Sequence, residues 1–429
     1  MLTQIRRTFR KEGFARGAAT LMTGTAVAQA IPIAISPILT RLFTPADYGV
    51  FALYAALVAW LSTAAAGRYE MAVMLPETEA DADALVVLSA LLAACFSFVL
   101  LIIIWFAHDW VAGVLGQPEI APWLFLLPVS VMLTAVYNAL NYWLNRRRNF
   151  RRMSANRVLQ SGLGGGLQIA FGISRLGALG LILGQLIGVV ITTAQIAFSF
   201  MKAMSSEKAS LRQRLPHLMH RYRNHPAHLL PSHLIGATAL QLPVFAVTFL
   251  YGTAIAGLYA FAYRLMVLPT SVIANALGDV YRQRASVSHR ERGEFRSLFL
   301  ITLGTAAAIG LGPLIISLIF APALFAFVFG EEWRVAGDYA RILAVATYFQ
   351  FVFVPVDKGA IIVGATRYIF FWHLSRLICF SAVFLSSWLA GLSIEHSLML
   401  FVLSNIVLYT ADGVVEYRLS RSRAAKGKS

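Results

Sequence analysis

The sequence predicts an all-α polytopic membrane protein with about twelve transmembrane helices, arranged as two six-helix bundles around a central cleft. Of the 429 residues, 58% are hydrophobic and only 13% are charged, whereas a soluble globular chain has about 25% charged residues. Apolar stretches of about 18 or more residues recur along the whole length. Each is long enough for a helix to cross the hydrocarbon core of a bilayer, which is about 30 Å thick.

The predicted spans follow one another with short connections, except at one central basic loop. They cover residues 20–40, 48–75, 85–107, 120–144, 156–174, 177–200, 229–251, 254–277, 297–320, 337–356, 367–390 and 394–417. We predict no cleavable signal peptide, so the first span doubles as the insertion signal. The predicted segments are a basic amino-terminal segment (1–19), a first bundle (20–201), a basic linker (202–228), a second bundle (229–417) and a basic tail (418–429).

Positive charge is distributed unevenly between the two ends of the spans. Thirty of the 36 Lys and Arg residues fall on one side, and only Arg41, Arg175 and Arg334 fall on the other. Cytoplasmic loops carry an excess of Lys and Arg, so we predict that both termini and the linker lie on the cytoplasmic side of the inner membrane. This topology accounts for the net charge of +16 without nucleic acid as a partner. The opposite loops are too short for an outer catalytic domain.

The two halves resemble each other weakly in sequence. The stretch TPADYGVFALYAAL (44–57) matches GTAIAGLYAFAYRLM (252–266), with Gly49 falling on Gly257. Because six spans is an even number, both halves enter the membrane from the same side, and the repeat is predicted to be parallel, as in some transporters. In the first copy, Thr44 is a predicted N-cap, followed by Pro45 at the first helical position.

Motifs of known catalytic and metal chemistry are absent from the sequence. It contains no GxxxxGK[ST], HExxH, GxSxG or CxxC, so we assign no catalytic residue, no metal site and no cofactor. The GLGGG stretch (162–166) is predicted to serve close helix packing. Cys95 and Cys379 fall inside apolar spans and are expected to act as small buried hydrophobes.

Ionisable residues inside the spans are the candidate functional residues, because such residues are costly in a membrane and face a partner or a water-filled cavity. Arg264 lies deep in the eighth span, and Asn275 follows three turns later on the same face; both are predicted to line a cavity that binds an anion. Arg41, at the outer end of the first span, is a further candidate, with anchoring at the membrane interface as the alternative.

Two further arginines lie in the second bundle. Arg341 follows Asp338 by three residues, so a local ion pair is expected beside a role in substrate contact or gating. Arg376 is a candidate for substrate contact, and the alternative is that its side chain reaches the interface near the inner end of its span.

Arg68 and Glu70 interrupt the second span in the stretch GRYEMAVMLP (67–76). One continuous helix over residues 49–75 would be about 40 Å long and would project past the bilayer core. Residues i and i+2 of a helix point about 200° apart, so we expect Arg68 and Glu70 not to share a contact. Arg68 is predicted to face an anionic ligand, and Glu70 to be a gate partner or one member of a structural pair.

Several stretches together resemble the polysaccharide and O-antigen flippases of the multidrug/oligosaccharidyl-lipid/polysaccharide exporter superfamily. They are LTRLFTPADYGVFAL (39–53), GRYEMAVMLP (67–76), LNYWLNRRRNFRRMSANRVLQSG (140–162), FGEEWRVAGDYARIL (329–343) and VPVDKGAIIVGATRY (354–368). The resemblance implies a two-lobed flippase that turns a polyprenyl-pyrophosphate-linked oligosaccharide from the cytoplasmic to the outer leaflet by alternating access. It implies a cationic central cavity, carried over onto Arg264, Arg41 and Arg68.

The resemblance also implies that an ion gradient drives transport, in agreement with the missing P-loop. Few acidic residues lie well inside the spans, which leaves the coupling ion, a proton or sodium, without an assigned residue. Expected partners are membrane lipids and the polymerase and chain-length machinery of O-antigen, capsule or exopolysaccharide synthesis. The alternatives are a membrane polymerase or glycosyltransferase, a drug exporter of similar architecture, and an assembly partner without transport. An arginine-lined cavity would repel the amphipathic cations that a drug exporter carries.

Overall fold

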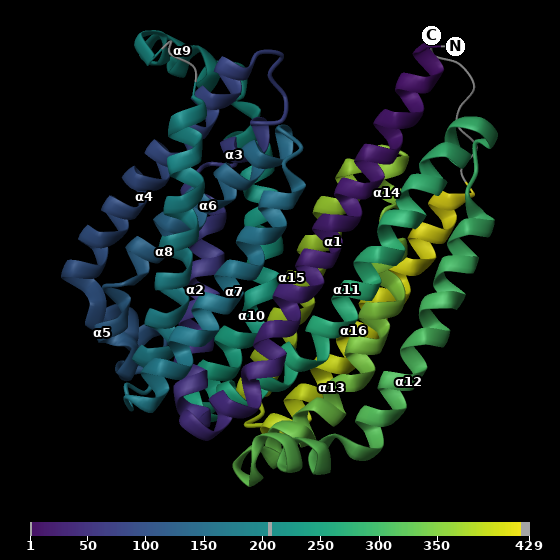
Figure 1. Cartoon of the computed structure of the whole chain (residues 1–429). Helices are drawn as coiled ribbons and strands as arrows, with labels where there is room; N and C mark the ends of the chain where they lie inside the picture. Colours follow the sequence, from purple (N-terminus) through teal and green to yellow (C-terminus); the bar gives the residue numbers. More distant parts are fainter. Residues whose placement is uncertain (1, 205–207, 422–429) are drawn as a thin grey trace. The chain divides into compact units, whose positions relative to one another are not determined.

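The computed structural model describes residues 2–204 and 208–421, which form helices joined by short turns, with no β-strand in these ranges (Figure 1). Met1 of the predicted amino-terminal segment, residues 205–207 of the linker and residues 422–429 of the tail lie outside the described residues. The described chain forms two compact units, and the division between them falls inside one helix, α10 (Leu230–Tyr251).

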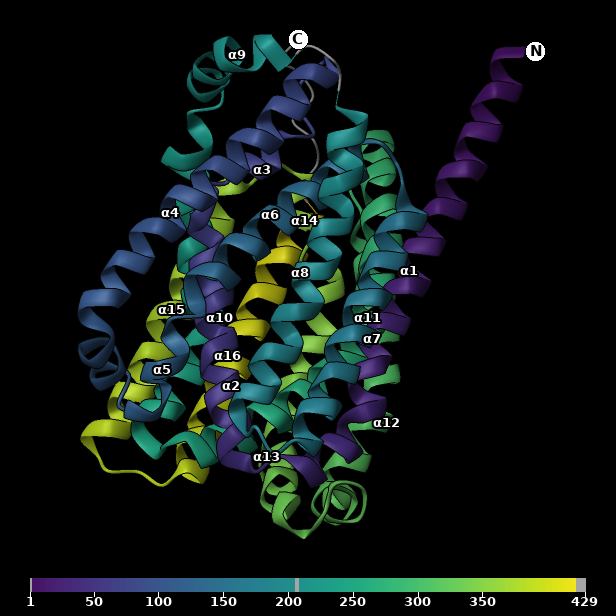
Figure 2. The same cartoon turned by 60° about the vertical axis from the view of Figure 1, so that its left-hand side comes forward.

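The first unit comprises the described residues up to Gln241, together with Gly252–Ala254. Besides the first half of α10, its helices are α1 (Leu2–Leu42), α2 (Pro45–Ala65), α3 (Tyr69–Ala72), α4 (Glu79–Val114), α5 (Ala121–Leu124), α6 (Leu127–Arg146), α7 (Phe150–Ile173), α8 (Ala178–Ala203) and α9 (Lys208–Arg221). The long helices α1 and α7 pack along each other, as do α7 and α8 (Figure 2).

The second unit comprises Leu242–Tyr251 and the described residues from Ile255 onward. Its helices are α11 (Thr253–Arg292), α12 (Arg296–Phe329), α13 (Arg334–Phe353), α14 (Gly359–Ile362), α15 (Thr366–Leu389) and α16 (Ile394–Ser420). Helix α13 packs against both α12 and α16.

The predicted spans coincide with these helices. By length and composition, ten described helices could cross a membrane, and the pair Pro118–Leu124 and Leu127–Arg146, bent by 57°, gives an eleventh. Helix α7, which coincides with the fifth predicted span, is not among these candidates, and its first turn carries two arginines. The chain is therefore an all-helical multi-pass membrane protein.

A parallel repeat is visible in the turns of the two halves. Gly116 and Gly330 each have positive φ and each precede the fourth span of a half, and they lie 214 residues apart. Gly177 and Gly391, also with positive φ, precede the sixth spans at the same separation. The same turns therefore recur at the same places, as expected for two bundles that enter the membrane from one side.

The start of the second span has the predicted local structure. Thr44 caps α2, with its side chain accepting a hydrogen bond from the Asp47 backbone N–H, and Asp47 in turn accepts one from the Thr44 N–H. Pro45 stands at the first helical position. This reciprocal capping satisfies two backbone donors that the first turn of a helix leaves unpaired.

The end of the second span differs from the prediction of one helix over residues 49–75. Helix α2 ends at Ala65, and Gly67 and Arg68 have φ of 58° and 64° before the short helix α3 begins. Two successive left-handed residues stop an α-helix. The prediction was wrong because it relied on apolar composition, which continues across this break. The break itself arises from the backbone conformation of Gly67 and Arg68.

The GLGGG stretch serves close packing on one face of α7 only. Gly164 and Gly165 are buried, and a Cβ at Gly188 of α8 would lie 3.1 Å from the Gly164 backbone N. At Gly162 and Gly166, a Cβ would meet no atom within 4 Å. Helices α7 and α8 therefore approach each other closely because Gly164 and Gly188 have no side chains.

Replacing Gly188 by Leu is expected to lower the thermal stability of the purified protein, because overpacking a close contact costs about 1–3 kcal/mol. The measurement is thermal unfolding in detergent or nanodiscs. Gly166→Leu is the matched control, since it adds the same side chain into open space. Equal shifts for the two variants would contradict the assignment.

Candidate functional site

The Arg68–Glu70 stretch forms a tight, paired turn in the first unit. Arg68 Nη1 lies 3.2 Å from Glu70 Oε1, and the Glu70 side chain is 6% exposed. The expectation that these residues share no contact was wrong, because it assumed the continuous helix that the Gly67–Arg68 turn interrupts. Arg68 is held in a left-handed conformation that is uncommon for a residue with a side chain. Both residues thus have a structural role here, and a ligand contact of Arg68 stays a prediction.

Further ion pairs at this end of the first unit join α4 to α6. Arg146 Nε lies 2.9 Å from Glu79 Oε1, and the Trp143 indole N–H donates to Asp83 Oδ1 at 2.9 Å. Arg147 lies over the Trp143 ring at 4.5 Å. These charges compensate one another, so the α4–α6 pair leaves little net field for a ligand.

The linker helix α9 docks on the same end of the first unit (Figure 2). Arg214 Nη1 lies 2.8 Å from Asp81 Oδ1, and the Tyr69 hydroxyl donates to the Met219 carbonyl at 3.1 Å. Leu218 is fully buried. Burial raises the pKa of the Tyr69 hydroxyl above its usual value, which keeps that group a neutral donor. The linker is therefore part of the first unit and not a free tether.

Other predicted residues lie at separate places. Arg41 is exposed in the last turn of α1. Arg341 Nη2 lies 3.0 Å from Asp338 Oδ1, and the two side chains are 50% and 39% exposed, so the expected local pair is present. Arg376 lies 5.9 Å and 5.5 Å from the ring centroids of Trp372 and Phe380. Arg341 and Arg376 belong to different helices of the second unit, α13 and α15, whereas Arg41 belongs to the first unit.

Arg264 and Asn275 lie on an exposed polar face of α11. They are eleven residues apart, which places them about 20° apart around the helix axis, and both are exposed. Ile273, Val280 and Val287, which are 39–50% exposed, lie roughly 140–180° around the same helix. The exposed surface of α11 therefore changes from apolar to polar around its circumference.

The polar face of α11 continues toward its carboxyl end. Asp279 and Arg282 follow on the same side and form an ion pair at 3.1 Å. An exposed arginine inside a span belongs beside water and not beside hydrocarbon, whereas exposed isoleucine and valine suit lipid. We therefore expect the Arg264 face of α11 to contact an aqueous region and the opposite face to contact lipid.

A buried polar stripe runs along α16 in the second unit. Asn405, Tyr409, Asp412 and Glu416 are all buried and lie on one side of the helix. The Tyr368 hydroxyl donates to Asp412 Oδ1 at 2.5 Å, from the start of α15. This stripe turns polar side chains toward the interior of the unit, which is unusual for a helix in an apolar span.

The connection between α13 and α15 closes over the stripe. Glu416 Oε1 accepts a hydrogen bond from the Ala360 backbone N–H at 3.2 Å. Asp357 Oδ1 lies 2.5 Å from Lys358 Nζ. Two carboxylates of α16, Asp412 and Glu416, thus lie near a third, Asp357, from the connection that precedes α14.

Sequence reasoning missed Asp357, Asp412 and Glu416. The signal was available for two of them, because Asp412 and Glu416 are one turn apart within the last predicted span and therefore share a face. Asp357 lies outside any regular pattern, and only the fold brings it close.

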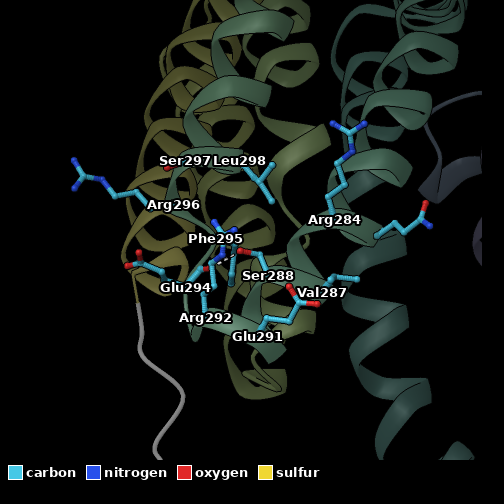
Figure 3. A pocket seen from close by; sticks show the side chains of 11 residues that line it. Arg284, Val287, Ser288, Glu291, Arg292, Glu294, Phe295, Arg296, Ser297 and Leu298 are labelled. Atoms are coloured by element: carbon cyan, nitrogen blue, oxygen red, sulfur yellow. Dashed lines mark hydrogen bonds between the residues drawn. The ribbon is translucent and has the colours of Figure 1, made fainter.

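A half-open pocket of about 610 Å³ lies at the turn between α11 and α12 (Figure 3). Its lining mixes both signs of charge: Arg284, Glu291, Arg292, Glu294 and Arg296, beside Ser288, whose Oγ donates to the Glu294 carbonyl at 2.7 Å. Phe295 lines the pocket and is only 2% exposed. Within residues 2–204 and 208–421, no group of three His, Cys, Asp or Glu side chains is placed to hold a metal ion.

Comparisons with known proteins add to this geometry. The sequence model of a family described as "Polysaccharide biosynthesis protein" matches residues 38–338. The succinoglycan biosynthesis transport protein ExoT of Rhizobium meliloti (strain 1021) is 23% identical over 397 residues, which cover 91% of this chain and 77% of ExoT.

Solved structures share the fold. An inward-facing multidrug resistance transporter of the MATE family, in the MOP superfamily, has a TM-score of 0.63 and 18% identity, over 95% of this chain and 96% of that one. A MOP-superfamily transporter from Pyrococcus furiosus also has a TM-score of 0.63 and 18% identity, over 96% of each chain. At these identities the likeness concerns the fold alone.

Replacing Glu70 by Gln is expected to destabilise the protein by about 1–3 kcal/mol, because it removes one partner from a largely buried charged hydrogen bond. The double variant Arg68→Met/Glu70→Met should recover most of this loss, since replacing both partners leaves no buried charge unpaired. Thermal or denaturant unfolding measures both. Asp338→Asn, in a half-exposed ion pair, is the control and should cost less than about 1 kcal/mol. A double variant less stable than the single one would contradict the structural role.

Proposed function

Because the chain belongs to the family described as polysaccharide biosynthesis proteins, we propose that it moves a polyprenyl-pyrophosphate-linked oligosaccharide from the cytoplasmic to the outer leaflet of the bacterial inner membrane. The chain is a multi-pass membrane transporter for polysaccharide biosynthesis and not an enzyme. The proposal concerns the lipid-linked cargo, its direction and the means of transport.

The observation that carries the proposal is the polar face of α11. Arg264 lies about a quarter of the way along this 40-residue helix, with Asn275 on the same exposed side. A charged side chain inside a span is costly unless it meets water, a partner or an ionic ligand. A transporter that handles an anion inside the membrane needs such a group where the cargo passes.

The chemistry of the cargo fits an arginine. The planar guanidinium donates two parallel hydrogen bonds to phosphate oxygens and stays charged at all physiological pH values. A pyrophosphate and a hydrated sugar chain cannot cross about 30 Å of hydrocarbon unaided. A polar protein surface shields them, while the polyprenyl tail remains in lipid and needs no protein pocket of its own.

The protein should make few contacts with the pyrophosphate group, since the cargo must also be released. A uniform, tight cage would hold the pyrophosphate in both states and move nothing, because a ligand shifts an equilibrium only by its difference in affinity for the two states. One arginine with neutral hydrogen-bonding neighbours such as Asn275 suits binding and release. Transport then proceeds by alternating access, driven by an ion gradient, since the sequence has no P-loop for ATP.

The position of the lipid-linked oligosaccharide tests the proposed function. After deletion of the gene, complete repeat units should accumulate on the inner face of the membrane, and surface polysaccharide should be lost. An impermeant sugar-modifying reagent applied to spheroplasts separates the two faces. Units on the outer face without polymer would contradict the proposal. No change in either pool, together with increased sensitivity to amphipathic cations, would indicate a drug exporter.

Replacing Arg264 by Gln is expected to reduce transport at least about tenfold, because a hydrogen bond to a charged group contributes about 1.5–3 kcal/mol. Arg264→Lys should retain part of the activity, since it keeps the charge but loses the planar fork. Complementation of the deletion strain measures both, with membrane abundance checked by immunoblot. Arg334→Gln is the matched control, because that arginine pairs with Glu331 at the exposed start of α13. Full activity of Arg264→Gln at normal abundance would contradict the role.

A further inference from the structure

Glu416 is a buried carboxylate with half of its hydrogen-bonding capacity unused. The residue is 1% exposed, and Oε1 accepts from the Ala360 N–H, but Oε2 has no hydrogen-bond partner. It forms no ion pair with any side chain in the described part of the chain. An ionised carboxylate in this position would lose its hydration without full compensation, so the site favours a proton on the free oxygen.

A second buried group without a partner faces the same place. Tyr281 of α11 is 2% exposed, and its hydroxyl has no hydrogen-bond partner. The charges that act on this hydroxyl are Glu416 and Asp357. No hydrogen bond joins this hydroxyl to Glu416 in the structure, although a buried hydroxyl usually finds a partner. A protonated carboxyl group both donates and accepts, so a small approach of the two groups would pair them.

The other two carboxylates of the cluster have partners of their own. Asp357 pairs with Lys358, and Asp412 accepts from Tyr368. The titratable and charged groups facing Glu416 and its neighbours are Tyr281 from α11, Asp357 and Lys358 from the α13–α14 connection, Tyr368 and Arg376 from α15, and Asp412 from α16. Glu416 is thus the member of the cluster left to take up and release a proton.

We propose that Glu416 is a proton-binding site whose occupancy controls the contact between α16 and the α13–α15 connection, and that this proton is the ion that couples transport to the gradient. The coupling part rests on the proposed function, whereas proton binding itself does not. The proton comes from water, binds Oε2 and returns to water, so no other reactant is needed.

The space around Oε2 suits a proton and not a metal ion. A Cβ placed on Gly359 would collide with Glu416 Oε2, so the oxygen lies against backbone. A metal ion needs several oxygen ligands arranged around it, and the side of Oε2 that faces Gly359 has no room for them. A proton adds almost no volume.

Protonation changes how firmly α16 holds the connection. Ionised Glu416 is a strong acceptor for the Ala360 backbone N–H in the first turn of α14. Hydrogen bonds to an ionised acceptor are roughly twice as strong as neutral ones. Proton uptake therefore weakens the link between α16 and α14, and proton release strengthens it.

The pocket at the α11–α12 turn provides a route from water. Phe295 lines this pocket (Figure 3), and its ring lies 3.6 Å from the position a Gly359 Cβ would occupy, which Glu416 also contacts. The Phe295 backbone N–H donates to the Ser420 carbonyl at 2.9 Å, one turn beyond Glu416. Phe295 thus adjoins both the pocket and the backbone that Glu416 Oε2 touches, and we expect movement of its ring to admit water to the carboxyl group.

Infrared difference spectroscopy of the purified full-length protein tests proton binding directly. The wild type should show a carboxylic acid C=O band from a buried group at neutral pH, and the band should be missing in Glu416→Gln. Glu331→Gln, at an exposed carboxylate, is the control and should retain it. A wild-type spectrum without this band, or a band that survives in Glu416→Gln, would overturn the proposal.

Hydrogen exchange of the α13–α15 connection tests the conformational consequence. In the wild type, the Gly359 and Ala360 amides should become less protected as the pH is lowered, beyond the intrinsic change in exchange rate. In Glu416→Gln, which mimics the protonated state, protection should be low and independent of pH. Phe295→Ala should leave the equilibrium protection near that of the wild type but speed the response to a pH jump. Protection that depends on pH equally in Glu416→Gln would overturn the switch.

A transport assay in proteoliposomes distinguishes the coupling role of Glu416 from the proposed transport function on which that role rests. With an imposed pH gradient, Glu416→Gln should reduce cargo movement to the level of empty vesicles, while Glu331→Gln stays active. If the wild type moves the lipid-linked oligosaccharide and Glu416→Gln does so equally well, the coupling role is wrong and the proposed function stands. If the wild type moves none but the infrared band is present, the cargo assignment is wrong and the proton site stands.

Discussion

An ionised side chain within a membrane-spanning bundle must be paired or must reach water, because hydrocarbon solvates neither charge nor unpaired polar groups. Several charged groups in the described part of the chain meet the condition by pairing locally. Arg68 pairs with Glu70, and Arg341 pairs with Asp338. A charge that is neutralised by a neighbouring residue needs no ligand, so these pairs are not evidence for a functional site. The residues that bear on function are Arg264, which is exposed within the span formed by α11, and Glu416, whose Oε2 is buried inside the second unit without a hydrogen-bond partner.

The two units use the same turns but distribute charge differently. In the first unit, the second span breaks at Gly67 and Arg68, and Arg68 pairs with Glu70. The docked linker neutralises Asp81 of α4 through Arg214. In the second unit, α11 runs as one helix from Thr253 to Arg292. A continuous helix can present one face along its whole length, and α11 carries arginine and asparagine on that face. The two units therefore carry different charged side chains on similar backbones. A shared fold does not imply a shared function.

Hydrophobic periodicity and turn chemistry were sufficient to predict most of the fold. The spans, the Thr44 cap and the division into two bundles all follow from local sequence, because helix formation in a membrane depends on apolar length and on capping groups. The break after Ala65 could not be predicted in this way, since Arg68 adopts a left-handed conformation that its residue type does not favour. For the site, the Arg341–Asp338 pair follows from spacing alone. The α16 stripe was missed because acidic residues were considered span by span and not by helical face, and the contact of Glu416 with Ala360 joins residues 56 positions apart.

Helix α11 gives a physical reason for cargo and proton to influence each other. Arg264 and Tyr281 lie 17 residues apart on it, about 25 Å along the helix, with Pro269 between them. Coupling requires that both ligands bind two states of the same element with different affinity. An interior proline removes a backbone hydrogen bond and favours bending, so a change of the bend at Pro269 would move Tyr281 and Arg264 relative to each other. The reciprocal effect follows by linkage: a proton that favours one position of Tyr281 favours the same position of Arg264. The proposed cargo face on α11 and the proposed proton site on α16, which Tyr281 of α11 adjoins, would together permit exchange of a proton against an anionic lipid.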